Sequence, residues 1–299
     1  MLKLSSVLGN SQRLDGGAMF GNAPRALWSR WLAPDEAGRV PLACRSFLLE
    51  TEQHKLLIET GIGSFFEPGL KDRYGVVESQ HVLIQSLAHL GVRPNEVDWV
   101  VLSHLHFDHA GGLLSEYEPG HALRLVFPKA RILVSRGAFE RARAPHPRDR
   151  ASFIPGLVEL LQESGRLVLW DEQSRLLPEE LGRALAFELS HGHTPDMLHT
   201  WLRGTRGSAF FCADLVPGAA WVHLPITMGY DRYPELLIDE KTRLYTELLE
   251  RGTQLLFTHD PSVAAARLQL DARGRYAAAD PVAEFVGWDL DASPAPAPG

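Results

Sequence analysis

Residues Ser103–Gly112 read "SHLHFDHAGG" and bring three histidines and an aspartate together within six positions. Alternate side chains of an extended segment point the same way, so His104 and His106 can face one ion while the chain is still strand-like. Asp108 and His109 are adjacent and need a turn, for which "HAGG" supplies flexible residues. That turn would bring them to a second point, at the roughly 3.5–4 Å separation of a two-metal site. The stretch predicts half of a dinuclear site.

The remaining ligands must come from elsewhere in the chain. A functional zinc ion needs about three protein ligands and an open position for water, so two ions need roughly six, or fewer with a bridging carboxylate. Candidates lie at predicted strand ends: His193 in "SHGHTPD", Asp214 in "FFCADLV" and His259 in "LLFTHDP". Strand ends deliver side chains to a shared rim of a sheet, where active sites are common. The expected metal ligands are His104, His106, Asp108, His109, His193, Asp214 and His259.

The other histidines and the cysteines have simpler interpretations. Structural or solvated roles are expected for His54, His81, His89, His121 and His146, whereas His191, His199 and His223 stay undecided. The two cysteines, Cys44 and Cys212, exclude a disulfide framework and lie in apolar runs. Both are interpreted as small buried hydrophobic residues, with a metal-ligand role for Cys212 as the alternative.

Composition limits the class of protein and its partners. The 299 residues are 45% hydrophobic and 22% charged, as in a packed globular chain. The formal net charge of −7 argues against nucleic acid and anionic membranes, which attract clustered Lys and Arg. No run approaches the ~20 apolar residues of a membrane span, and no signal-like segment opens the sequence. We expect a cytoplasmic protein with a small-molecule substrate.

From residue 41 onward, β-like and helix-like segments alternate, which predicts sheets inside and helices outside. The runs 43–50 and 55–60 predict a hairpin, 80–91 a helix ending on Gly91, and 97–103 a buried strand before the histidine motif. The second half repeats this theme, which indicates two similar halves. The apolar stripe and charge pairs of 234–251 predict a helix that Gly252 ends. One domain is expected over 1–288, including an N-terminal extension of about 1–39, with a disordered Pro/Ala-rich tail at 289–299.

The motif residues together resemble the metallo-β-lactamase superfamily, whose H-x-H-x-D-H signature is matched by "HLHFDH". The pattern continues in "GHTPD", "CADL" and "FTHD", and the resemblance covers roughly residues 40 to 262. "DGGAMFGNAPRALW" and "PELLIDEKTRLY" further resemble the branch of quorum-quenching lactonases and organophosphate hydrolases. The resemblance implies an α+β fold, an αββα sandwich of two mixed β-sheets flanked by helices.

The resemblance also implies how the ligands divide between two ions. One ion takes His104, His106 and His193, the other takes Asp108, His109 and His259, and Asp214 bridges them. Zinc is expected, with manganese or iron as alternatives.

This sequence departs from the family at three places. Glu59 stands where members usually have an aspartate that supports the site, Asp196 and Met197 replace Gly-His after "GHTP", and no tyrosine closely follows Asp214 as it does in acyl-homoserine lactonases.

The expected reaction is hydrolysis of an ester or lactone by a metal-bridging hydroxide, because metal binding lowers the pKa of water to roughly 7. Asp108 would help to move the proton and Asp214 would bridge the metals, while Asp260 and Glu59 would orient histidines. The expected substrate pocket consists of Phe20, Trp28, Phe107, Met228 and Tyr230.

A specific candidate activity is that of an N-acyl-homoserine lactonase, and a homodimer is the oligomeric state considered. The alternatives are an organophosphate or phosphoester hydrolase and, from another class, a persulfide dioxygenase with one iron. A nuclease of the same fold and a catalytically silent binding protein are less favoured, since the chain is acidic and no ligand is missing.

Overall fold

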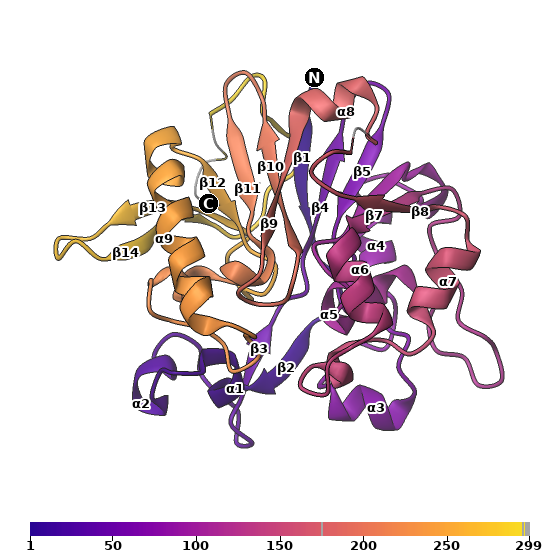
Figure 1. The fold of residues 1–299 in the computed structure, drawn as a ribbon, viewed down its shortest axis with the longest axis horizontal. Coiled ribbons are helices and arrows are strands. Elements are labelled where there is room, and N and C mark those ends of the chain that lie inside the picture. The colour runs from indigo at the N-terminus through magenta and orange to yellow at the C-terminus, as the bar shows by residue number, and fades with distance from the viewer. Residues whose placement is uncertain (175, 295, 297–299) are drawn as a thin grey trace. The chain divides into compact units, whose positions relative to one another are not determined.

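The computed structural model describes residues 1–174, 176–294 and 296, and they fall into two compact units (Figure 1). Unit 1 comprises Met1–Leu4, Leu14–Leu42 and Leu177–Gly299, and unit 2 comprises Ser5–Arg13 and Ala43–Leu176. Each unit contains a mixed sheet and its own helices. The end of the predicted disordered tail, at 295 and 297–299, lies outside the described residues.

Unit 2 is built on a mixed sheet in which β1, β4, β5, β6, β7 and β8 are neighbours in that order. β4 and β5 form the antiparallel hairpin predicted from sequence, and β5 through β8 run parallel. The strands are β1 (Lys3–Val7), β4 (Ser46–Glu50), β5 (Lys55–Ile58), β6 (Trp99–Val101), β7 (Arg131–Ser135) and β8 (Leu167–Trp170). β6 is buried along its length and lies between β5 and β7. The position of the residues that follow it is therefore set by the sheet.

Three helices of unit 2 supply apolar side chains to one core with this sheet, and they lie beside β7 and β8 in Figure 1. They are α4 (Val82–His89), α6 (Arg136–Arg143) and α7 (Leu157–Glu163). The shorter helices are α3 (Pro68–Arg73) and α5 (Phe107–Ala110). The core joins Leu87 of α4 and Phe139 of α6 to Val100 of β6, and all three are almost fully buried. The rigid end of β6 therefore precedes the histidine motif.

Unit 1 contains a second mixed sheet, in the order β14-β13-β12-β11-β10-β9, in which only the β11·β12 pair is parallel among the described residues. The strands are β9 (Leu185–Ser190), β10 (Met197–Arg203), β11 (Ser208–Phe211), β12 (Gln254–Leu256), β13 (Ala265–Leu270) and β14 (Tyr276–Val282). β9 and β11 are both antiparallel to β10, so β9, β11 and β12 run in one direction. Their carboxyl ends therefore meet at the same edge of the sheet.

The helix α9 (Pro234–Arg251) lies along this sheet in Figure 1. Pro234 opens it, and Gly252, in the left-handed conformation at φ 62°, ends it, as the sequence predicts. Unit 1 also contains the small elements α1 (Gly16–Phe20), α2 (Arg25–Trp28), β3 (Arg39–Leu42), α8 (Glu179–Ala184) and β15 (Trp288–Asp289). Strand β2 (Gln12–Asp15) pairs with β3.

Two further features concern the ends of the chain and membranes. β15 pairs with Lys3 and Leu4, and the Leu290 amide donates to the Leu2 carbonyl, so hydrogen bonds continue past residue 289. Within the described residues, no helix combines the length and the apolar character that crossing a bilayer requires.

Candidate metal centre

The motif half-site consists of His104, His106, Asp108 and His109 and lies where β6 ends in unit 2. The ring centroids of His104 and His106 are 4.3 Å apart, and those of His104 and His109 are 4.1 Å apart. The three histidines are at most 6% exposed. His104 and His106 precede α5, whereas Asp108 and His109 lie on it, so the predicted turn is a single helical turn. Three buried imidazoles thus share a small volume.

Buried partners engage the Nδ1 atoms of two of these rings. Ser103 Oγ is 2.9 Å from His104 Nδ1, and Glu59 Oε2 is 3.4 Å from His109 Nδ1. Glu59 Oε1 also accepts a 2.8 Å hydrogen bond from the Ser103 amide. His109 Nε2 is 3.9 Å from Asp108 Oδ1. Both rings therefore present Nε2 as the atom that can bind a metal, as is usual where outer partners orient ligands.

Glu59 is the residue at which this chain departs from the family pattern, and its backbone is unusual as well. It is fully buried and has a φ of 65°, which side chains rarely adopt because Cβ crowds the backbone. Such strain persists where the surroundings hold the residue, and it clusters at functional sites. The carboxylate contacts to Ser103 and His109 provide that hold, whereas the role of Glu59 in orienting a histidine stays a prediction.

The glycines of "HAGG" are needed for close packing as well as for turning. A Cβ at Gly112 would lie 2.0 Å from the Thr60 carbonyl oxygen, and one at Gly111 would lie 2.2 Å from the Ile62 carbonyl oxygen. Thr60 in turn donates from its amide and its hydroxyl to the His109 carbonyl, at 3.0 and 2.8 Å. The loop after β5 thereby holds α5 against the end of the sheet.

The scaffold half-site consists of His193, Asp214 and His259, which follow β9, β11 and β12 in unit 1. Asp214 Oδ2 is 3.2 Å from His193 Nε2, and its Oδ1 is 3.3 Å from His259 Nε2. Each residue is at most 4% exposed. One carboxylate thus contacts a different imidazole with each of its oxygens. The three parallel strand ends bring together ligands that are far apart in sequence.

The chemistry of this donor set fits metal ions. His193 Nδ1 lies 2.9 Å from Asp231 Oδ1, and a carboxylate requires a proton on that nitrogen. Nε2 is then the ring atom that can bind a metal ion, and a cation between Nε2 and the Asp214 carboxylate would be held by both groups. Ligand atoms about 2.0–2.2 Å from a tetrahedral zinc ion are separated by roughly 3.3–3.6 Å, close to the separations around Asp214.

Asp231 was not predicted from the sequence. It lies 38 residues beyond His193 in an irregular connection, where neither spacing nor periodicity marks it. Asp260, which was predicted to orient a histidine, accepts hydrogen bonds from the amides of Ala219, Ser262 and Val263 at 2.9–3.0 Å. Asp260 therefore shapes the turn that directly follows His259.

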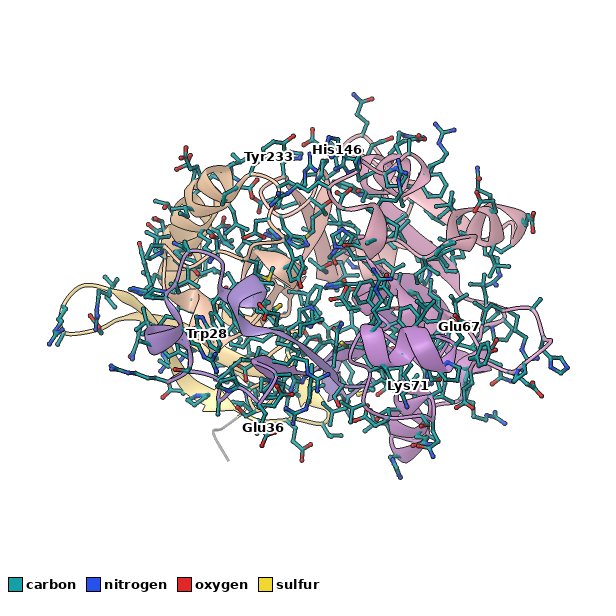
Figure 2. All side chains as sticks on the ribbon, turned by 90° about the horizontal axis from the view of Figure 1, so that it is seen from below. Trp28, Glu36, Glu67, Lys71, His146 and Tyr233 are labelled. Carbon is teal, nitrogen blue, oxygen red and sulfur yellow. The ribbon has the colours of Figure 1, made fainter. Side chains whose placement is uncertain are left out.

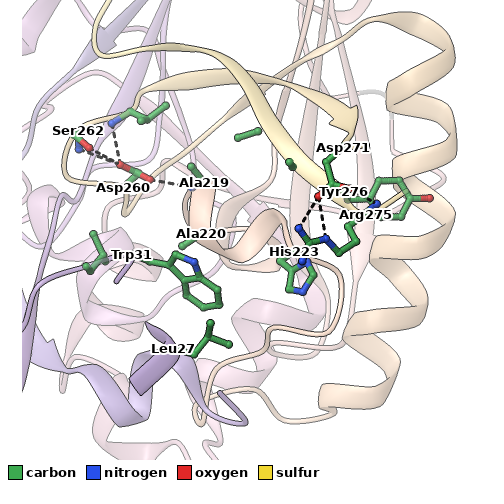
Figure 3. Close-up of a pocket in the computed structure, with 14 residues that line it drawn as sticks. Leu27, Trp31, Ala219, Ala220, His223, Asp260, Ser262, Asp271, Arg275 and Tyr276 are labelled. Carbon is green, nitrogen blue, oxygen red and sulfur yellow. Dashed lines mark hydrogen bonds and ion pairs between the residues drawn. The ribbon is translucent and has the colours of Figure 1, made fainter. Parts of the chain in front are cut away.

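Asp260 also borders a pocket of about 620 Å³ within unit 1 (Figure 3). One side of this pocket is apolar and includes Leu27 and Trp31 from the N-terminal segment, while His223 and Arg275 lie on the polar side. Burial lowers the pKa of His223, so this imidazole is neutral at neutral pH. The turn after a candidate metal ligand thus forms part of a pocket wall.

The residues predicted to form a substrate pocket differ in their surroundings. In unit 1, Phe20 stacks between Trp28 (labelled in Figure 2) and Trp221, with centroid distances of 5.8 and 4.4 Å. Met228 is buried, whereas Tyr230 is 42% exposed. In unit 2, Phe107 is partly buried and lies 4.6 Å from Tyr74, centroid to centroid. Phe107 and Tyr230 thus have surface available for contact.

Other histidines and the cysteines have packing roles or lie at the surface. His81 is buried with Nε2 3.0 Å from the Gly112 carbonyl oxygen, and His146 (Figure 2) is exposed. His199 is buried against Phe210, with a centroid distance of 5.2 Å. Cys212 donates from Sγ to the Leu256 carbonyl at 3.2 Å, and burial raises its pKa far above the ordinary range. The structural interpretation of Cys212 is therefore favoured.

The sequence of this chain is similar to those of known proteins. Residues 39–259 match the model of the Metallo-beta-lactamase superfamily. An N-acyl homoserine lactonase from Bacillus sp is 27% identical over 138 residues, which are 42% of this chain and 49% of that protein. The chain thus spans about half the length of the curated relatives that it matches first.

Several solved structures are similar to this chain over most of its length. A probable metal-dependent hydrolase from Staphylococcus aureus has a TM-score of 0.81 at 25% identity, covering 94% of this chain and 98% of that one. AidC, a dizinc quorum-quenching lactonase solved with N-hexanoyl-L-homoserine, has a TM-score of 0.68 at 19% identity, covering 92% of each chain. At 19% identity, the similarity to AidC shows the fold alone.

Proposed function

Because the chain belongs to the metallo-β-lactamase superfamily, we propose that it is a dinuclear metal-dependent hydrolase of esters or lactones. An N-acyl-homoserine lactone is the more specific candidate substrate, because lactonases are among the relatives. The membership confirms the family predicted from the sequence and its fold class, α+β with two mixed sheets flanked by helices.

The observation that carries the proposal is the position of Asp214. Its two oxygens contact the Nε2 atoms of two different histidines, as a carboxylate that bridges two ions requires. We assign His104, His106 and His193 to one ion and Asp108, His109 and His259 to the other. Zinc is the proposed metal, because imidazole and carboxylate are its usual ligands and AidC is described as dizinc.

The bound metals would lower the pKa of a water molecule and so supply the nucleophile at neutral pH. Asp108 is less buried than the histidines around it, so its carboxylate can accept a proton from a substrate-side group. Ser103, Glu59 and Asp231 orient the rings from outside. The exposed faces of Phe107 and Tyr230 are proposed to contact the apolar part of the substrate.

The test is an activity panel on the metal-loaded full chain. Zinc-, manganese- and iron-loaded protein is assayed with acyl-homoserine lactones, aryl esters and phosphotriesters. We expect hydrolysis of a lactone or ester, and we expect His109→Ala to abolish it while the exposed-histidine control His121→Ala keeps it.

Three outcomes would contradict the proposal. Phosphotriesters as the best substrates would indicate the phosphoester alternative. Oxygen consumption with one iron per chain would indicate the persulfide dioxygenase class. Full hydrolysis by His109→Ala would exclude the two-metal mechanism.

A further inference from the structure

Asp231 is a buried carboxylate with both oxygens engaged. It is 1% exposed, its Oδ1 is 2.9 Å from His193 Nδ1, and its Oδ2 accepts a 2.6 Å hydrogen bond from the Met228 amide. The Met228 bond fixes how the carboxylate is turned, because a carboxylate held at one oxygen has little freedom at the other. The imidazole of His193 is therefore held from its outer side.

The residues that follow Asp231 hold the main chain of the same loop. The Arg232 amide donates to the His193 carbonyl at 3.1 Å, and the Tyr233 amide donates to the Gly192 carbonyl at 2.8 Å. A Cβ at Gly192 would lie 2.5 Å from Leu237 Cα, so the loop lies directly against α9. One short segment thus fixes both the ring and the backbone of His193.

Glu240, on α9, holds the preceding residues of this loop. Its carboxylate is 5% exposed and accepts hydrogen bonds from Ser190 Oγ at 2.6 Å, the His191 amide at 2.7 Å and the Gly192 amide at 3.2 Å. Residues 190 to 193 are therefore each tied to the segment 231–240, Ser190 by its side chain and the other three by their backbone. With the main chain fixed in this way, the remaining freedom of His193 is the rotation and tautomer of its ring.

We propose that Asp231 is a positioning residue that fixes the Nδ1–H tautomer of His193 and so presents Nε2 to the metal ion. This inference rests on the proposed function of the same site. The negative charge of Asp231 also makes His193 a stronger metal ligand, since a carboxylate bound to the outer nitrogen of a histidine raises the basicity of its metal-binding nitrogen. The role of Asp231 is exerted through His193.

The first test measures zinc affinity in the full chain by competition with a chromogenic chelator. Asp231→Asn retains the shape but loses one carboxylate oxygen, and we expect zinc binding weaker by about 10–100-fold for one of the two ions. Asp239→Asn, an exposed carboxylate eight positions along the same segment, is the matched control and should bind zinc like the wild type. His193→Ala defines the effect of losing the ligand altogether. Wild-type zinc affinity in Asp231→Asn would overturn the inference.

The second test needs no folded variant of Asp231. Wild-type protein labelled with ¹⁵N in histidine is examined without metal at about pH 8, with the His193 resonances assigned from their absence in His193→Gln. We expect a proton on Nδ1, because the Asp231 carboxylate can only accept. An Nδ1 of His193 that carries no proton would overturn the inference.

These outcomes separate the inference from the proposed function. If the wild type binds two zinc ions but hydrolyses no ester or lactone, the proposed function fails while the role of Asp231 is judged by zinc affinity. If the wild type binds no zinc, the dinuclear proposal fails and the tautomer of His193 decides whether Asp231 orients the ring.

Discussion

The two half-sites are built in opposite ways. The motif half-site takes four candidate ligands from six consecutive positions, and the turn that arranges them is a single helical turn after β6. The scaffold half-site takes three ligands from three strand ends spread over residues 193–259, and it needs α9 and the Asp231 segment to hold them. The first is encoded locally, whereas the second depends on the assembled fold. Substitutions should therefore act on the two half-sites differently.

The largest effect is expected at Asp214. Asp214→Asn removes the charge shared by His193 and His259, so we expect loss of at least one ion. If the metals contribute several kcal/mol to transition-state stabilisation, kcat falls by about 10³-fold. Metal content by elemental mass spectrometry and kcat on the best substrate check this, with Asp239→Asn as control. Two retained ions with unchanged kcat would contradict a bridging role.

The next effect concerns the scaffold itself. Glu240→Ala removes the acceptor of three donors, two of them buried, and because buried unsatisfied groups cost roughly 1–3 kcal/mol each, we expect a loss of about 3 kcal/mol in the free energy of unfolding. Urea denaturation of metal-free protein measures it. Asp239→Ala, exposed on the same helix, should change stability by less than about 0.5 kcal/mol. Equal stability of both variants would show that the 190–193 loop does not depend on α9.

Glu59 offers the corresponding test in the motif half-site. Glu59→Gln keeps the side-chain length but replaces one of the oxygens that contact Ser103 and His109. We expect one ion to bind about 10–100-fold more weakly while the other is unaffected. Stepwise zinc titration followed by calorimetry resolves the two ions. Equal weakening of both would mean that Glu59 supports the whole centre rather than His109.

The smallest effect is acid sensitivity that originates away from the ligands. Burial lowers the pKa of His199 from 6.5 to about 3, so between these values the unfolded chain binds a proton that the folded chain does not. Stability is therefore lost as pH falls below 6.5, by about 2 kcal/mol at pH 5 from 1.36 kcal/mol per pKa unit.

His199→Leu should reduce the loss of stability between pH 8 and pH 5 by that amount. Urea denaturation of metal-free wild-type and variant protein at both pH values measures the difference. An equal loss in both proteins would show that His199 is not the source.

The same contrast explains what the sequence could predict. The motif half-site follows from spacing alone, and the hairpin, α4, β6 and α9 were predicted from alternation, apolar periodicity and terminal glycines. The strand-end positions of His193, Asp214 and His259 followed from apolar runs that end in polar residues. Each of these signals lies within a short stretch of the chain, so it can be recognised in a single sequence.

What the sequence did not reveal depends on long-range packing. Asp231 and Glu240 meet the His193 loop only after α9 packs against it, and nothing in "GYDRYP" marks a histidine partner. The left-handed backbone of Glu59 is likewise imposed by contacts with Ser103 and His109, because glutamate itself disfavours that conformation. Strands such as β13 and β14 were missed because charged residues interrupt their apolar pattern.

The central claim, that the two half-sites form one dinuclear centre, is tested most directly by zinc stoichiometry in a double variant. His106 and His193 come from different half-sites and are assigned to the same ion. The wild type should bind two zinc ions per chain, and His106→Ala, His193→Ala and the double variant should each retain one. A double variant that retains none, or a wild type that binds a single ion, would contradict the account.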